Sequence, residues 1–236
     1  MRFHSGVRHL GVVALSVMGA ASSAWATAVY VPPSLNLGDT YRIVFVTSAV
    51  RDATSSNIAD YNADGLAAAL TDPGLASLVT TWTALVSTQS VNALTNAGLS
   101  LSDTTTPFFN TQGDLIATGV TVAGTGLYGG ATTAHVNGIA DQDGVPDARD
   151  IWTGTNSDGT TSSPLGAGGN VLYGRDVHLD SQWTFYSSSF QTNQAPIFVV
   201  SGLLTVTPEP ATAGLMGLGV AVLLWSAKMR KAHTSV

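Results

Sequence analysis

Hydrophobic residues follow three patterns along the chain. Near each end they form an almost unbroken run, at residues 10–21 and 211–227. Between these runs they come in short clusters separated by Gly, Ser, Thr, Asn and Asp, which is typical of strands and short helices joined by turns. The pattern predicts one folded domain, residues 27–207, with a targeting segment on each side.

The first run has the features of a secretory signal peptide. Arg2 and Arg8 precede it, and Ala24-Trp25-Ala26 follows it with a small residue at each end. These features predict a signal peptide of residues 1–26, with Ala24 and Ala26 forming the cleavage site. An uncleaved amphipathic anchor is the alternative, but the apolar core is too short to cross a membrane comfortably.

The second run predicts a transmembrane helix at about residues 211–227. At about 1.5 Å per residue it would span roughly 25 Å, slightly less than the hydrocarbon core of a bilayer. A basic cluster follows and predicts a cytoplasmic tail, residues 228–236, with the rest of the chain outside. The basic residues are Lys228, Arg230 and Lys231. A buried core helix is the alternative, and the missing polar face argues against it.

The tripeptide Pro208-Glu209-Pro210 stands directly before this run. Two prolines favour a short extended segment that an enzyme can bind as a strand. The tripeptide, the apolar run and the basic end, residues 208–236, together resemble the PEP-CTERM sorting signal of Gram-negative bacteria that make exopolysaccharide. The resemblance implies an exosortase-like membrane peptidase as a partner, which recognises the tripeptide and removes the tail. It also implies a transient stay in the inner membrane, followed by release to the cell surface or extracellular matrix.

The composition of residues 27–207 limits what the domain can bind. This region has four Arg, no Lys and 14 Asp, a net charge of −10. Such a charge argues against nucleic acid or an anionic membrane surface as a partner. The chain has no cysteine, which excludes disulfides, thiolate metal sites and a cysteine nucleophile. Its stability therefore depends on its hydrophobic core.

The first part of the domain predicts one strand and one helix. Residues 41–47 are rich in β-branched and aromatic side chains, which favours a strand. Possible N-caps at residues 54–57 precede Ile58, Tyr61 and Leu66, and this spacing favours a short helix.

The rest of the domain predicts mostly short strands. Asp72-Pro73-Gly74 favours a turn, and residues 75–97 fit both a helical turn and a strand. Residues 196–206 favour a strand pair with a bend at Ser201-Gly202. We therefore expect a single α+β domain, mostly β, with one or two short helices.

A second resemblance concerns the domain, over about residues 38–205. Its motifs are Gly38-Asp39-Thr40-Tyr41-Arg42, Arg51-Asp52-Ala53-Thr54, Ile151-Trp152-Thr153-Gly154-Thr155, Asp158-Gly159, Gly174-Arg175, Asp180-Ser181 and Trp183. They are similar to an exported domain that occurs beside PEP-CTERM tails and resembles a C-type-lectin-like fold. The resemblance implies a core formed by Trp152, Trp183 and the final strand. Sugar binding is not implied, because the chain lacks a Glu-Pro-Asn type triplet.

The acidic stretch 139–150 has the composition of a calcium loop. Calcium takes six to eight oxygen ligands, and closely spaced carboxylates around a glycine turn can supply them. Read as a 12-residue loop, the stretch resembles thrombospondin type 3 and dockerin loops, although Ile139 occupies the first ligand position. The predicted ligands are Asp141, Asp143, Asp147 and Asp150, with the carbonyl of Val145. The alternative is an acidic hairpin loop that joins a strand near Val136 to a strand at Ile151.

Residues suited to catalysis are few. His178 lies between Asp176 and Asp180, with serines at 187–189, so a secreted hydrolase is the alternative function. The other histidine of the domain is His135. No nucleophile-elbow, zinc-protease or phosphate-loop motif occurs, so we do not expect an enzyme. Three tryptophans could stack on sugars but are more often core residues; they are Trp82, Trp152 and Trp183. We expect a binding or structural role in exopolysaccharide or biofilm.

Overall fold

The computed structural model describes residues 31–129, 135–146 and 148–207. The predicted signal peptide, the Pro-Glu-Pro tripeptide, the predicted transmembrane helix and Asp147 lie outside these ranges. Within them, no helix combines the length and the apolar character needed to cross a membrane.

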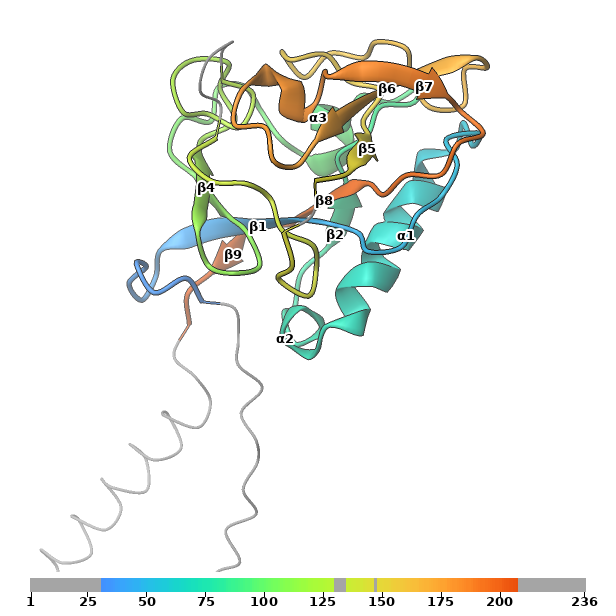
Figure 1. The fold of residues 1–236 in the computed structure, drawn as a ribbon. Helices are drawn as coiled ribbons and strands as arrows, with labels where there is room; N and C mark the ends of the chain where they lie inside the picture. The colour runs from blue at the N-terminus through green and yellow to red at the C-terminus, as the bar shows by residue number, and fades with distance from the viewer. Residues whose placement is uncertain (1–30, 130–134, 147, 208–236) are drawn as a thin grey trace, which may run out of the picture.

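A mixed sheet of six strands forms the centre of the described domain (Figure 1). Its strand order is β2-β8-β1-β3-β4, and β9 pairs with the start of β1. Only the β1–β3 pair is parallel among these pairings. The strands are β1 (Thr40–Val46), β2 (Trp82–Ala84), β3 (Pro107–Phe109), β4 (Leu115–Thr118), β8 (Phe198–Ser201) and β9 (Leu204–Thr205).

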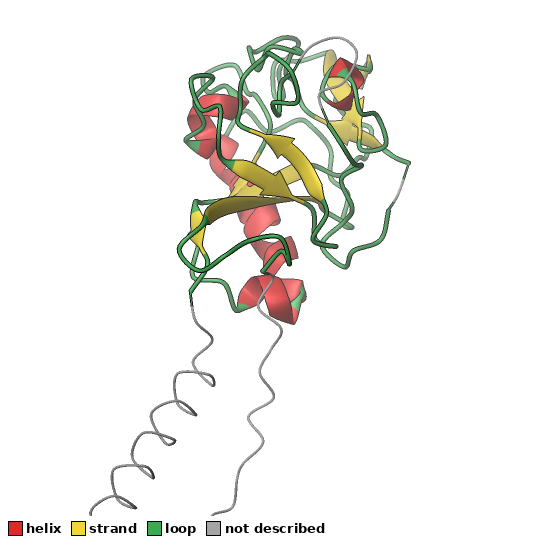
Figure 2. Ribbon diagram, turned by 90° about the vertical axis from the view of Figure 1, so that its left-hand side faces the viewer, coloured by secondary structure: helices red, strands yellow, loops and turns green. Residues whose placement is uncertain are grey.

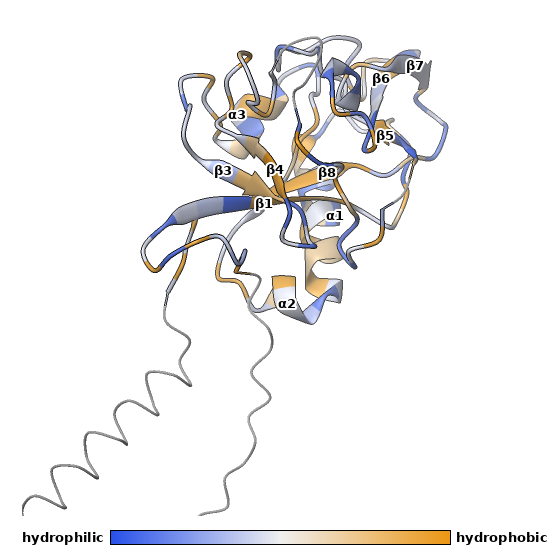
Figure 3. Cartoon of the chain, turned by 60° about the vertical axis from the view of Figure 1, so that its left-hand side comes forward, coloured by the Kyte–Doolittle hydropathy of each residue, from blue (hydrophilic) through white to orange (hydrophobic). Residues whose placement is uncertain are grey.

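Strand β1 is buried on both faces. Successive side chains of a strand point to opposite faces, and here Tyr41, Ile43 and Phe45 join one hydrophobic cluster while Val44 and Val46 join another. Figure 3 shows hydrophobic residues on strands of this sheet such as β4 and β8. This double burial explains the continuous apolar run that predicted the strand.

Helix α1 (Ile58–Thr71) covers one face of the sheet (Figure 2). The side chain of Asn57 accepts a hydrogen bond from the Ala59 amide and so caps the helix, as the sequence predicted. The short helix predicted from the spacing of Ile58, Tyr61 and Leu66 is present. Tyr61 is buried, whereas Leu66 is 44% exposed. Gly65 lies against the sheet instead, because a Cβ there would lie 3.0 Å from a methyl carbon of Val199.

The region from Asp72 to residue 97 contains two more helices. Asp72 and Pro73 do not form a simple turn, because Asp72 caps α2 (Pro73–Ala76) through the Leu75 amide and proline suits the first helical position. Both predictions for residues 75–97 hold in part, since strand β2 and helix α3 (Ala93–Ala97) lie in the same segment.

A second sheet of three strands packs beside the first. Its antiparallel order is β5 (Asp150–Trp152), β6 (Asn170–Arg175) and β7 (Ser187–Phe190), and the short 3₁₀ helix η1 (Ser181–Trp183) lies between β6 and β7. The Trp152 amide donates to the Pro196 carbonyl at 2.9 Å, which joins β5 to the segment leading into β8.

The α+β class is confirmed, with three α-helices and nine strands in the described ranges. This is more than the one or two helices expected. Val136 is not part of a strand; its amide donates to the Ile116 carbonyl instead. Trp152, Trp183 and Leu204 are buried as expected, while the likeness to a C-type-lectin fold stays a prediction.

The two ends of the described domain lie side by side (Figure 1). Thr40 pairs with Thr205, the Val206 amide donates to the Asp39 carbonyl at 2.9 Å, and the Gly38 amide donates to the Val206 carbonyl at 3.0 Å. The segment before the tail is therefore fastened to the first strand of the fold.

Candidate functional site

The predicted calcium ligands have different surroundings. The Asp141 carboxylate accepts hydrogen bonds from the amides of Asp143 (3.0 Å) and Val145 (2.8 Å). Asp150 belongs to β5, and its Oδ1 accepts from Nε of Arg175 at 2.7 Å. In the described parts of the chain, no three acidic or histidine side chains are grouped as a metal site. Asp141 and Asp143 thus share a turn, Asp147 lies outside the described residues, and calcium binding stays a prediction.

His178 has a carboxylate nearby but no serine. Its Nδ1 lies 3.7 Å from Oδ1 of Asp180, and its ring packs on that of Tyr186 with centroids 5.2 Å apart. Among the described contacts, none joins the His178 ring to a hydroxyl of Ser187–Ser189. The other histidine, His135, is buried and packs against Trp183. In the described contacts, the His178 ring is thus paired with a carboxylate and a tyrosine ring, and no nucleophile is seen beside it.

The three tryptophans are core residues. Trp82, Trp152 and Trp183 are 6%, 1% and 0% exposed. Trp82 packs edge-on against Phe45 in the main sheet. None of the three presents a free ring face for a sugar.

The second sheet carries a different aromatic surface, which no sequence motif indicated. The rings of Tyr173 and Tyr186 pack with centroids 5.9 Å apart, and the Arg175 guanidinium lies 4.3 Å over the Tyr186 ring. Tyr186 is 37% exposed. These side chains meet because Tyr173 pairs with Ser187 in the β6–β7 register, which brings Tyr186 next to the end of β6.

A polar pocket adjoins this surface. The pocket has a volume of about 200 Å³. Trp152 and Tyr173 are its aromatic lining residues, and its polar groups come from β5, β7 and the turn before β8. The lining residues are Asp150, Trp152, Tyr173, Ser189, Asn193, Gln194 and Ala195. We call this pocket together with Tyr186 the β5–β7 site.

Local contacts hold the walls of the β5–β7 site in place. The indole Nε1 of Trp152 donates to the Arg51 carbonyl at 3.0 Å, which fixes that ring. Asn193 Nδ2 donates to Ser189 Oγ at 2.7 Å, and the Asn193 amide donates to the Phe190 carbonyl at 3.0 Å, so the turn after β7 is closed. The Gln194 side chain is exposed and can turn its amide toward a ligand.

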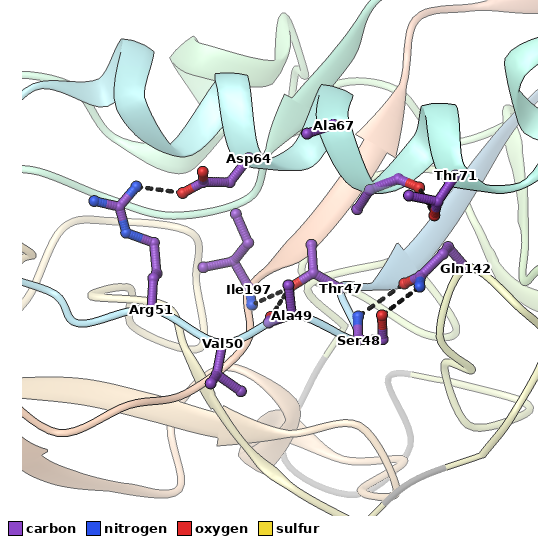
Figure 4. Close-up of a pocket in the computed structure, with 11 residues that line it drawn as sticks. Thr47, Ser48, Ala49, Val50, Arg51, Asp64, Ala67, Thr71, Gln142 and Ile197 are labelled. Carbon is purple, nitrogen blue, oxygen red and sulfur yellow. Dashed lines mark hydrogen bonds and ion pairs between the residues drawn. The ribbon is translucent and has the colours of Figure 1, made fainter.

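A second pocket, of about 220 Å³, lies between α1 and the segment after β1 (Figure 4). Its floor contains Ala67 and Ile197, and its polar groups are paired with one another. Arg51 forms an ion pair with Asp64, and Gln142 is bonded to Ser48. No aromatic side chain is among the lining residues described for this pocket, so it lacks a ring on which a sugar could pack.

Comparison with known protein families matches residues 206–231 to the PEP-CTERM protein-sorting motif. The match includes the predicted tripeptide and basic residues, and it begins at Val206, the residue fastened to β1. The predicted PEP-CTERM motif is therefore confirmed at residues 206–231, and it supports export and sorting by an exosortase-type membrane enzyme. No curated protein matches the chain.

Proposed function

We propose that the domain binds a polysaccharide of the cell envelope or extracellular matrix at the β5–β7 site, without turnover. The observation that carries this proposal is a polar pocket with an aromatic wall, next to an exposed tyrosine ring. The chain would reach its place through a signal peptide, residues 1–26, and a transient membrane helix at about residues 211–227.

Sugars need this combination of groups. One face of a sugar ring is apolar and packs on aromatic rings, while its hydroxyl groups need donors and acceptors close together. Tyr173 and Tyr186 supply the rings. Asp150, Asn193 and Gln194 supply a carboxylate and two amides around the same pocket.

Binding without turnover agrees with the surroundings of His178. Hydrolysis by a triad needs a serine within hydrogen-bond reach of the histidine, and the neighbours of the His178 ring are Asp180 and Tyr186. A hydrolase acting through His178 would release reducing ends from a bound polymer, which a binding protein would not.

A glycan array with the purified exported protein tests the proposal. Tyr186→Ala should weaken binding about five- to tenfold, because a stacked aromatic contact contributes on the order of 1 kcal/mol. Leu66→Ala is the matched control, because Leu66 is similarly exposed but lies on α1. Equal affinity of the Tyr186→Ala variant and the wild type would contradict this site, and release of reducing ends would favour the hydrolase.

A further inference from the structure

We infer that the β5–β7 site selects sugar units without acidic groups and prefers units that carry a free amino group. This inference rests on the proposed function and goes on to the charge of the ligand. It follows from how the domain uses its arginines and from the position of Asp150.

The arginines of the domain are engaged within the protein. Residues 27–207 contain four arginines and no lysine. The partners within the described ranges are the Ser201 carbonyl for Arg42, Asp64 for Arg51, the Ser48 carbonyl for Arg149 and Asp150 for Arg175. None of these four arginines is among the lining residues described for the pocket in the β5–β7 site.

Arg175 is the arginine whose side chain pairs with a residue of the β5–β7 site. Its Nε donates to Asp150 Oδ1 at 2.7 Å, and its guanidinium carbon lies 4.3 Å over the Tyr186 ring. The strand register sets this pair, because Asp150 and Arg175 are directly opposite in β5 and β6. A uronic acid in the pocket would therefore meet the Asp150 carboxylate, because Asp150 lines the pocket and Arg175 is not among its lining residues.

Asp150 has room for a donor from a ligand. Its Oδ1 takes the bond from Arg175, its side chain is 44% exposed, and it lines the pocket. A carboxylate oxygen accepts more than one hydrogen bond, and bonds from a charged donor are stronger than bonds from a neutral one. An ammonium group on a sugar would thus bind more tightly here than a hydroxyl or an acetylated amine. The negative net charge of the domain also attracts an ammonium group, but salt at 0.15 M screens this attraction beyond about 8 Å.

Calorimetry with three short oligosaccharides tests the inference: tetramers of glucosamine, of N-acetylglucosamine and of galacturonic acid. The full exported protein is used at pH 6 and 0.15 M NaCl, where a sugar amine is protonated. We expect the glucosamine tetramer to bind about tenfold more tightly than the acetylated one, which corresponds to one charged hydrogen bond. The galacturonic acid tetramer should give no heat of binding.

Aspartate variants distinguish an effect of the Asp150 carboxylate from an effect of the net charge of the domain. Asp150→Asn should reduce the tenfold preference to about twofold or less. Asp60→Asn, on α1, makes the same change in net charge and should keep the preference. Asp150→Glu should also keep the preference for glucosamine, because it keeps the carboxylate. This variant replaces Asp150→Asn in the comparison if Asp150→Asn does not fold.

The contrary outcomes are distinct. Galacturonate binding as tight as that of glucosamine, or an equal effect of Asp150→Asn and Asp60→Asn, would overturn the charge selectivity and leave polysaccharide binding intact. Binding of none of the three tetramers, together with a negative glycan array, would overturn the proposed function and this inference with it.

Discussion

His135 is the residue whose burial has the clearest consequence for stability. It is 2% exposed, its Nε2 lies 3.2 Å from the Leu127 carbonyl, and its ring lies 4.6 Å from that of Trp183. Within the described part of the chain, its Nδ1 has no hydrogen-bond partner. Burial disfavours the charged ring and lowers the pKa of His135 from 6.5 to about 4.

This shift predicts that the domain loses stability between pH 6.5 and pH 4. In that window the unfolded chain takes up a proton that the folded domain refuses, so folding weakens as the pH falls. The free energy of unfolding should drop by about 2 kcal/mol from pH 7 to pH 5. Urea unfolding at the two pH values measures this, and His135→Gln should remove most of the difference. If the free energy of unfolding of the His135→Gln variant still falls by the same amount between the two pH values, other groups cause the effect.

Three aspartates, Asp52, Asp103 and Asp158, have a lowered pKa in the folded domain. They affect stability only at lower pH, because their carboxylates are ionised in the folded and the unfolded chain at pH 5.

At the scale of elements, the close approach of β6 to η1 depends on a glycine. A Cβ on Gly174 would lie 1.7 Å from the Trp183 carbonyl oxygen, a backbone atom that cannot move aside without shifting η1. Gly174→Ala should therefore destabilise the domain by about 3 kcal/mol or more and disturb the neighbouring Tyr173. The control is Gly168→Ala, where a Cβ meets nothing within 4 Å and only the positive φ of 82° is unfavourable. Thermal melting compares the two, and equal melting temperatures would show that η1 adjusts freely.

The sequence predicted best those elements whose formation depends on a short, continuous stretch of residues. Strand β1 shows its apolar run directly, and the Asn57 cap marks the start of α1. The face that α1 packs on the sheet could not be predicted in this way, because the helix buries small residues and hydrophobic size does not reveal a close contact such as that of Gly65 with Val199.

The β5–β7 site could not be predicted in the same way. Tyr173 and Tyr186 meet through a strand register across the intervening η1, and Asn193 and Gln194 join them from a turn. Asp150 suited a calcium loop by spacing alone, but the pairing of β5 with β6 places it opposite Arg175. Contacts between strands determine the positions of these side chains, and no local pattern encodes such contacts.

At the scale of the whole molecule, the sorting tail begins where the fold ends. Val206 is 7% exposed and is bonded to the backbone at Gly38 and Asp39, and only Thr207 separates it from the tripeptide. A peptidase that binds its substrate as an extended strand needs several free residues on each side of the recognised segment. We therefore expect the end of β9 to leave β1 before the enzyme binds the tripeptide, so that the stability of this short pairing limits the rate of tail removal.

A spacer in the native host tests this coupling. Six Gly and Ser residues inserted between Thr207 and Pro208 should speed removal of the tail severalfold, because the enzyme no longer has to open the β9–β1 pairing. Glu209→Ala should leave the tail in place and the protein in the membrane fraction, which shows that the same motif is used. Intact mass and cell fractionation after a pulse of synthesis measure both effects. Equal rates with and without the spacer would mean that the folded domain does not obstruct the peptidase, and removal of the tail from the Glu209→Ala protein would mean that the tripeptide is not its signal.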